Sequence, residues 1–176
     1  MLKKCKHGLF VLLEKMLRWA ISPRLRARLL ALLGAQIGRN VRIYEIQLFN
    51  LKDGFRNLVV ADDVHIGPGC RLDLEARLAI GARTTLSPGV TVLTHQDPGS
   101  AHGIGLLEIY PPFTRATSIE SDCWVGVNAI ILAGVTMHHM SVIAAGSVVT
   151  ADVLSNTLVA GAPARTKKSL GSSSTT

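Results

Sequence analysis

The sequence of 176 residues is poor in aromatic side chains, with four phenylalanines, two tryptophans and two tyrosines. This leaves little material for a core of large rings, whereas the many β-branched residues and leucines suit a narrow core of stacked aliphatic side chains. There are only three cysteines, Cys5, Cys70 and Cys123, and none belongs to a CxxC pair. We therefore expect neither a disulfide framework nor a cysteine zinc site, and we expect a reducing compartment.

The sequence also lacks an uninterrupted apolar run long enough to cross a bilayer. Glu14, Lys15 and Arg18 interrupt the apolar stretch near the N-terminus, whereas a spanning helix needs about 20 predominantly apolar residues. The apolar run 8–13 is short for a secretory signal, and no convincing cleavage site follows it. We therefore predict a cytoplasmic protein.

Acidic residues are nearly absent from residues 1–33, where Glu14 stands alone against eight basic residues. The difference equals the whole net charge of +7, so the rest of the chain is balanced and we expect no nucleic-acid partner. The basic residues of this segment are Lys3, Lys4, Lys6, Lys15, Arg18, Arg24, Arg26 and Arg28.

Aliphatic side chains recur at every sixth position in the second half of the chain, at Ile119, Val125, Ile131, Met137, Ile143 and Val149. Small or compact residues follow each of them by four positions, at Cys123, Ala129, Val135, Ser141, Ser147 and Val153. Helices repeat near 3.6 residues and strands near 2, so neither gives a period of six alone. The period indicates a solenoid in which short strands and turns alternate and successive coils stack.

The same period is present earlier in the chain. It runs through Val60, Ile66 and Leu72 and, after a two-residue insertion, through Ile80, Leu86 and Val92, with a fainter copy at 37–43. An antiparallel β protein with chance spacing is the alternative, but the strict alternation that it requires is missing. We therefore predict an all-β solenoid over residues 35–168.

Residues 5–33 have the apolar spacing of two short amphipathic helices. Ser22 and Pro23 suit the N-cap and first turn of the second helix, and Gly34 suits its end. Two interpretations of this segment, residues 1–34, remain open. It can cover the open end of the solenoid, because terminal coils need a cap. It can also bind an anionic membrane as a basic amphipathic segment.

The period fails in residues 94–118, which are rich in proline and glycine. We expect a loop thrown out from the solenoid, and long loops on rigid scaffolds often carry function. The segment 161–165 ends the solenoid, and residues 169–176 have the composition of a disordered tail.

Taken together, these residues resemble the hexapeptide-repeat acyltransferases over about residues 37–168. The most specific stretches are CWVGVNAIILAGVTM, IAAGSVVTADV and VAGAPARTKK. The ending GAPAR is typical of the maltose, galactoside and xenobiotic acetyltransferases. The stretch CRLDLEARLAIGARTTLSPGVTVLTH is similar to sugar and exopolysaccharide O-acetyltransferases, such as those of colanic acid synthesis.

The resemblance implies a left-handed parallel β-helix that assembles as a homotrimer, with acetyl-CoA bound between neighbouring subunits. It implies direct transfer of the acetyl group to a hydroxyl of a sugar or saccharide precursor of the exopolysaccharide or lipopolysaccharide type. By this likeness His95, where the coil ends and the loop begins, is the general base. Asp73, beside the two-residue insertion, and Asp97 are candidates for orienting the imidazole or holding the acceptor. A backbone N–H in a turn would stabilise the oxyanion.

The resemblance also implies a set of residues for acetyl-CoA. Trp124 matches a tryptophan that lines the pantetheine channel in relatives, and Val127 replaces a small polar residue of the galactoside branch. Ala145 and Thr150 match positions that face CoA. The remaining matches are basic residues, which suit the adenosine phosphates: Arg165, Lys167 and Lys168.

Three other kinds of protein are alternatives to a sugar O-acetyltransferase. The serine acetyltransferases have a histidine where this chain has Leu74, and their long helical domain is absent, which disfavours that branch. A carbonic anhydrase on the same solenoid needs three zinc-binding histidines, and the adjacent pair His138 and His139 points opposite ways on a strand. We therefore expect no metal. A non-catalytic scaffold subunit is the third rival.

Overall fold

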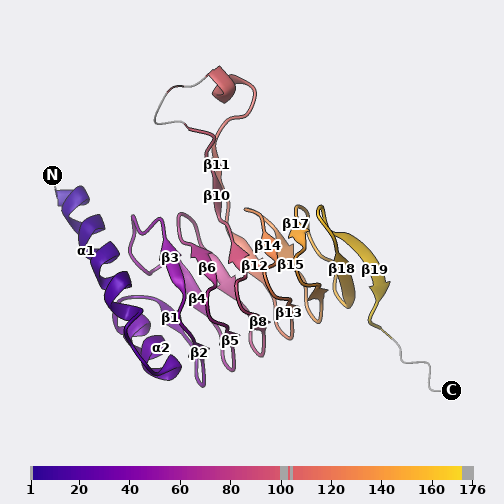
Figure 1. Ribbon diagram of the computed structural model, residues 1–176, viewed down its shortest axis with the longest axis horizontal. Coiled ribbons are helices and arrows are strands. Elements are labelled where there is room, and N and C mark those ends of the chain that lie inside the picture. Colours follow the sequence, from indigo (N-terminus) through magenta and orange to yellow (C-terminus); the bar gives the residue numbers. More distant parts are fainter. Residues whose placement is uncertain (1, 100–102, 104, 172–176) are drawn as a thin grey trace.

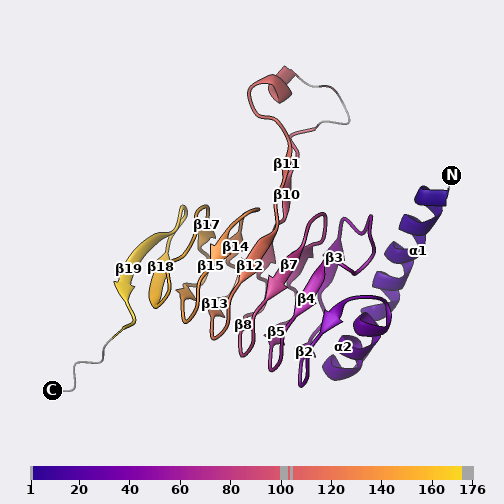
Figure 2. The same cartoon turned by 180° about the vertical axis from the view of Figure 1, so that it is seen from behind.

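A computed structural model describes residues 2–99, 103 and 105–171, of which 2–6 are described by their backbone alone. The described chain is a stack of short parallel strands that form three sheets, with two helices at one end (Figures 1 and 2). This confirms the predicted left-handed parallel β-helix with an N-terminal helical hairpin.

Each coil from β1 to β17 contributes one strand to each of three sheets, and β18 and β19 then extend sheet B alone. Sheet A contains β1 (Gln36–Ile37), β4 (Leu58–Val60), β7 (Leu78–Ile80), β12 (Thr117–Ile119) and β15 (Thr136–Met137). Sheet B contains β2 (Arg42–Ile43), β5 (His65–Ile66), β8 (Thr85–Leu86), β13 (Trp124–Val125), β16 (Val142–Ile143), β18 (Thr157–Ala160) and β19 (Arg165–Ser169). Sheet C contains β3 (Gln47–Phe49), β6 (Arg71–Asp73), β9 (Thr91–Val92), β14 (Ile130–Ile131) and β17 (Val148–Val149). We call the turns between the sheets the A–B, B–C and C–A corners.

The residues that recur at every sixth position form the core of the solenoid. The six aliphatic residues between Ile119 and Val149 are each at most 2% exposed, because each points inward from its strand. The small residues that follow them by four positions are also buried, and Ser141 and Ser147 are fully so. Parallel pairing then places equivalent aliphatic residues in columns, for example Ile80 beside Ile119 and Ile119 beside Met137.

The two helices close the N-terminal end of the stack. Helix α1 (Leu2–Leu17) begins earlier than the sequence indicated, and α2 (Pro23–Leu32) follows a Ser22 N-cap whose Oγ accepts from the Leu25 N–H at 3.4 Å. Helix α2 packs on β1 and β2, and α1 packs on β3. In the part of the chain that the structure describes, no helix is long and apolar enough to cross a membrane.

The predicted loop is an arm with regular structure of its own. Strands β10 (His95–Gln96) and β11 (Phe113–Thr114) pair antiparallel and form a stalk, and the 3-10 helix η2 (Gly105–Glu108) lies near its tip. The arm projects away from the stack at the C–A corner in both ribbon views (Figures 1 and 2). It returns where the Arg115 N–H donates to the Thr94 carbonyl at 2.8 Å.

The C-terminal end differs in detail from the sequence prediction. Residues 161–164 of the predicted end 161–165 form a turn, and Arg165 begins β19, which pairs antiparallel with β18. Because β19 runs to Ser169, the boundary at 168 falls inside a strand. Residues 172–176 of the predicted tail, and the loop residue His102, lie outside the described residues.

Candidate active site

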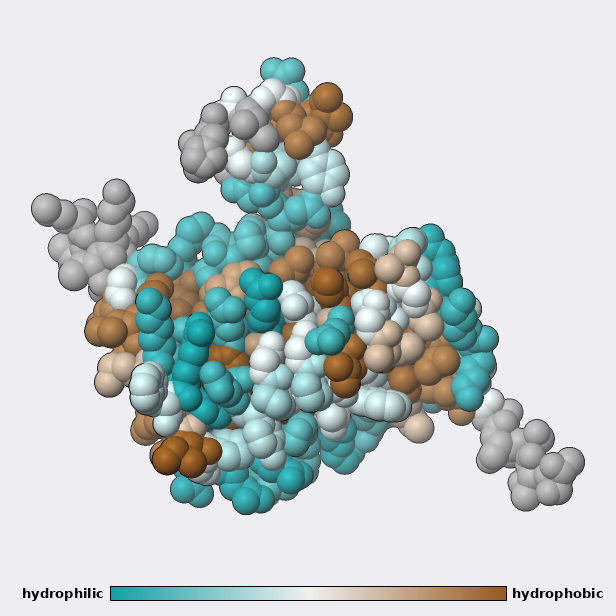
Figure 3. Space-filling view, viewed as in Figure 1, coloured by the Kyte–Doolittle hydropathy of each residue, from teal (hydrophilic) through white to brown (hydrophobic). Residues whose placement is uncertain are grey.

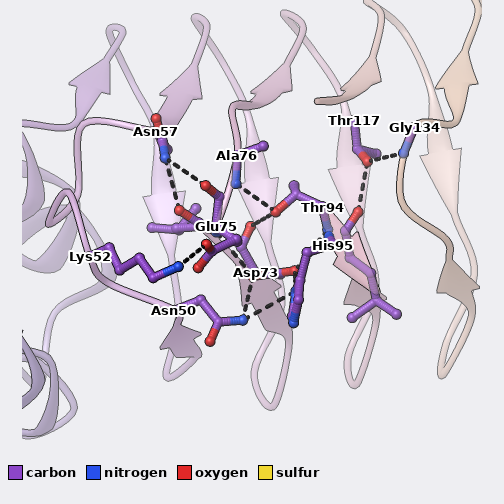
Figure 4. Close-up of polar contacts among 12 residues, drawn as sticks. Asn50, Lys52, Asn57, Asp73, Glu75, Ala76, Thr94, His95, Thr117 and Gly134 are labelled. Atoms are coloured by element: carbon purple, nitrogen blue, oxygen red, sulfur yellow. Dashed lines mark hydrogen bonds and ion pairs between the residues drawn. The ribbon is translucent and has the colours of Figure 1, made fainter. Parts of the chain in front are cut away.

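Asn50, Asp73 and His95 lie together where three consecutive coils leave sheet C (Figure 4). Phe49 pairs with Asp73, and Leu72 pairs with Val92, so the ends of β3, β6 and β9 lie side by side. Residues 23 and 45 positions apart in the chain thus become neighbours through the register of sheet C.

The Asp73 carboxylate is fully buried and accepts five hydrogen bonds. Its Oδ2 accepts from the Thr94 N–H at 2.9 Å, from the His95 N–H at 3.0 Å and from His95 Nδ1 at 2.5 Å. Its Oδ1 accepts from Asn50 Nδ2 at 2.8 Å and from the Glu75 N–H at 3.1 Å. A buried carboxylate needs such donors, and here the donors leave it one orientation.

These donors also set the charge of Asp73. Burial alone would raise the pKa of its carboxyl, since desolvation disfavours the charged form. The hydrogen bonds from His95, Asn50, Thr94 and Glu75 outweigh burial, and the pKa of Asp73 is lowered. The carboxylate is therefore an anion that can only accept hydrogen bonds.

The anionic Asp73 fixes the tautomer of His95. Because Oδ2 can only accept, Nδ1 carries the proton of the 2.5 Å contact, and Nε2 of the neutral ring keeps its lone pair. Asn50 Nδ2 also lies 3.3 Å from Nδ1 and packs against that edge of the ring. The imidazole is therefore held at Nδ1 and can accept a proton at Nε2.

His95 lines an open hollow of about 420 Å³ at the base of the arm. The ion pair between Lys52 and Glu75 lines the hollow, as do Phe113 and Thr114 of the stalk. The remaining lining residues are Asn50, Gln96, Asp97 and Pro112. The hollow combines amides, carboxylates, a cation and an aromatic ring.

Asp97 is less closely built into this site than Asp73. It is exposed, it lines the hollow, and its Oδ1 accepts from the Gly99 N–H at 2.8 Å. The structure therefore brings Asp73 into direct contact with His95 and places Asp97 at the rim of the same hollow.

The residues matched to acetyl-CoA are exposed and lie mainly on another edge of the solenoid. Trp124 on β13 is 55% exposed, and its Nε1 donates to Ser87 Oγ at 3.0 Å. Val127 and Ala145 lie at the B–C corner, and Arg165 and Lys168 lie on β19 of sheet B. One of them, Thr150, follows β17 and lies at the C–A corner, as His95 does.

Asn50 and Thr94 also belong to the site, although the sequence did not predict a role for them. Thr94 is fully buried, and its Oγ1 accepts from the Ala76 N–H at 3.0 Å and donates to the Asp73 carbonyl. Asn50 has a left-handed backbone, with φ of 58°, which asparagine tolerates better than most residues. The only signal was the position of Asn50 just beyond a strand in the faint first coils.

The described residues contain no group of three histidine, cysteine, aspartate or glutamate side chains that could hold a metal ion. His138 Nδ1 contacts Glu120 at 3.1 Å at the A–B corner, away from the arm. Burial raises the pKa of Cys70 to about 11 and also raises the pKa of Cys123, so both thiols are protonated core residues.

Known proteins share both the repeat and the fold. Residues 116–151 match the family described as the hexapeptide repeat of succinyl-transferase. A galactoside O-acetyltransferase of Lactococcus lactis is 28% identical over 93% of this chain and 77% of its own length. A 2,3,4,5-tetrahydropyridine-2,6-dicarboxylate N-acetyltransferase of Clostridium perfringens is 48% identical, but over 38% of this chain and 27% of its own length.

Solved structures agree in fold. A hexapeptide-repeat acetyltransferase of Vibrio cholerae, complexed with acetyl-CoA, aligns with a TM-score of 0.82 over 96% of this chain and 89% of that one, at 23% identity. A maltose O-acetyltransferase of Clostridium difficile aligns with a TM-score of 0.80 over 97% and 89%, also at 23% identity. The chain therefore carries the hexapeptide repeat, has the fold of these acetyltransferases, and resembles them as its sequence predicted.

Proposed function

We propose that this protein transfers an acetyl group from acetyl-CoA directly to a hydroxyl of a saccharide, with His95 as the general base. The observation that carries the proposal is the 2.5 Å contact between His95 Nδ1 and the buried Asp73 carboxylate, at the wall of an open hollow. A neutral imidazole whose orientation and tautomer are fixed is the group that this chemistry needs.

His95 acts twice in the proposed reaction. Its Nε2 accepts the hydroxyl proton while the acceptor oxygen bonds to the thioester carbonyl carbon. Asp73 stabilises the imidazolium that forms, because its anionic Oδ2 already accepts from Nδ1. As the carbon–sulfur bond breaks, the imidazolium returns the proton to the departing thiolate, and the products are the acetyl ester and CoA. Direct transfer needs no covalent nucleophile on the protein, and the buried thiols of Cys70 and Cys123 stay protonated.

The chemistry of the hollow supports a saccharide acceptor. Carboxylates and amides such as Glu75 and Gln96 can bind the hydroxyls of a sugar, and a ring such as Phe113 can cover its apolar face. The two relatives named for galactoside and maltose agree with this choice. We propose a saccharide precursor of the exopolysaccharide or lipopolysaccharide type.

The positions of the candidate residues also support a homotrimer. Sheet C separates the B–C corner, where Val127 and Ala145 lie, from the C–A corner that carries His95. One chain alone therefore keeps most of the cofactor residues and the base on different edges. A neighbouring copy whose B–C corner faces His95 would complete the acetyl-CoA groove.

The test is release of CoA thiol from acetyl-CoA with sugars, nucleotide sugars and lipid-linked sugars as acceptors. We expect turnover with at least one acceptor, and a fall of at least ~100-fold in His95→Ala. The matched control is His139→Ala, which removes a histidine from the A–B corner and should leave turnover unchanged. Near-full activity of His95→Ala would remove the base assignment. A chain that neither binds CoA nor releases it with any acceptor would instead be a scaffold.

A further inference from the structure

Helix α1 has two apolar stripes where a cap needs only one. Phe10, Leu13 and Leu17 pack against the solenoid core. Leu9, Leu12 and Met16 lie three and four residues apart on a second stripe, and they are 54%, 56% and 61% exposed. A helix that only covers the end of a solenoid should be polar on its outer side.

The exposed apolar surface continues beyond α1. Trp19 and Ile21, in the turn between the helices, are 87% and 99% exposed, and Leu25 and Leu32 of α2 are also exposed. Figure 3 shows brown, apolar side chains among teal, charged ones over this helical end of the molecule. We call these residues the outer face of the cap: Leu9, Leu12, Met16, Trp19, Ile21, Leu25 and Leu32.

The exposed cations around the outer face are not neutralised by the carboxylate of Glu14. Glu14, the one acidic residue before Glu45, is buried, pairs with Arg18 at 2.9 Å and accepts from the Leu48 N–H at 3.1 Å. Among the described residues, exposed Lys15, Arg24 and Arg28 have no ion-pair partner.

Two of these cations share a hollow. Arg24 and Arg28, one turn apart on α2, line an open space of about 390 Å³ between α2 and the first coil. Arg39 also lines it, but a bidentate contact with Asp62 neutralises its guanidinium. The hollow therefore offers two uncompensated guanidinium groups, which suit a phosphate or carboxylate.

The cap is held rigidly, so this face is already formed. The guanidinium of Arg26 is buried and donates to the carbonyls of Leu17 at 3.0 Å and Ile43 at 2.9 Å, and also to that of Ala20. These bonds tie the end of α1 and the turn to the solenoid. The outer face cannot turn inward without breaking them.

We propose that the outer face of the cap docks on an anionic lipid surface, with Trp19 and Ile21 entering the interface and Arg24 and Arg28 binding phosphate head groups. Apolar side chains combined with unpaired cations are what such a surface binds. A second copy of the chain fits poorly, because the same patch on both partners would bring Arg24 and Arg28 against their own equivalents. The inference does not depend on the acyl-transfer proposal.

The test uses the full chain with Trp124→Phe, which leaves Trp19 as the one tryptophan. Vesicles of phosphatidylcholine, alone or with phosphatidylserine, are added, and Trp19 fluorescence and co-sedimentation are measured. We expect a blue shift and sedimentation with the anionic vesicles only. Neutralising Arg24 and Arg28 together with glutamine should weaken binding roughly 30-fold, at about 1 kcal/mol for each cation.

A second variant separates lipid contact from folding. Leu9→Ser with Leu12→Ser should abolish the blue shift, whereas Leu154→Ser, a 67% exposed leucine outside the cap, should leave it unchanged. Circular dichroism should be the same for all variants. Absence of binding to anionic vesicles would overturn the proposal. A Trp19 blue shift that grows with protein concentration without vesicles would also overturn it, because it would assign the face to a second copy.

Discussion

The C–A corners and the B–C corners of this solenoid differ in how regular their lengths are. From residue 67 onwards the B–C corners are 67–70, 87–90, 126–129 and 144–147, all of one length. The C–A corners between β3 and β15 are 50–57, 74–77, 93–116 and 132–135. The B–C corners keep one length, whereas two of the C–A corners, 50–57 and 93–116, are longer.

The difference in length is matched by a difference in residues. At the B–C corner a Cβ on Gly126 would lie 2.5 Å from the Ala145 nitrogen, and one on Gly67 would lie 2.8 Å from the Pro88 nitrogen. At these two positions the next coil lies too close for a side chain. The B–C corners bury small polar side chains such as Ser147, whereas a buried carboxylate, Asp73, lies at the edge of a C–A corner beside Thr94. The regular corners thus hold the coils in register, and the irregular corners bring Asp73, Thr94 and His95 together.

The largest effect should come from the irregular corner. Asp73→Asn replaces an acceptor-only carboxylate by an amide, so the tautomer and the imidazolium of His95 lose their support. We expect turnover to fall at least ~100-fold with the fold intact. Thiol-release kinetics measure the fall, and Asp152→Asn, an exposed acceptor of the Thr136 N–H, is the control. Equal turnover in Asp73→Asn would show that His95 needs no anion.

The same variant should change the response to acid. Because the pKa of Asp73 is lowered in the folded state, its contribution to stability is present above the unfolded carboxyl pKa of about 3.9. That contribution is lost as the pH falls from there through the folded pKa. Asp73→Asn should therefore unfold with a shallower pH dependence below about pH 4.

A smaller effect, on stability rather than rate, should come from the regular corner. Gly126→Ala forces a methyl group onto the backbone of Ala144 and Ala145, and we expect a loss of about 1–3 kcal/mol in the free energy of unfolding. Urea unfolding measures it. Gly105→Ala is the matched control, since a Cβ there meets no atom within 4 Å. Equal midpoints for the two variants would contradict the close stacking of the coils.

The smallest effect should separate cofactor binding from catalysis. Trp124→Ala removes a half-exposed indole from sheet B, and we expect the KM for acetyl-CoA to rise about tenfold with kcat nearly unchanged. Trp124→Phe should recover much of the loss. A fall in kcat with an unchanged KM would mean that Trp124 acts at the reacting atoms instead.

The period of six predicted the fold because the inward-pointing positions of a β-solenoid accept only a narrow range of side chains. Residues such as Ile131 and Ser147 point inward, and the narrow core tolerates only aliphatic or small side chains there. The breaks in the period also drew attention to Asp73 and His95. The structure brings these two residues into direct contact. Their catalytic role stays a prediction.

Other features of the structure have no recognisable signal in the sequence. Asn50 reaches the site through the pairing of β3 with β6, where the hexapeptide signal is faint. The β10–β11 stalk has no apolar alternation, because β10 consists of the half-buried polar residues His95 and Gln96 and β11 of the exposed residues Phe113 and Thr114. Strand β19 consists only of exposed residues, so no burial pattern marks it as a strand.

Strand β19 also protects one edge of sheet B from pairing with another molecule. Sheet B would otherwise end in the free edge of β18, on which another chain's strand could continue the ladder. Antiparallel pairing with β19 covers that edge, and Lys167 and Lys168 place charge beside it. The helices lie over the opposite end. A repeat that could in principle stack from molecule to molecule is thereby kept from growing into a fibre.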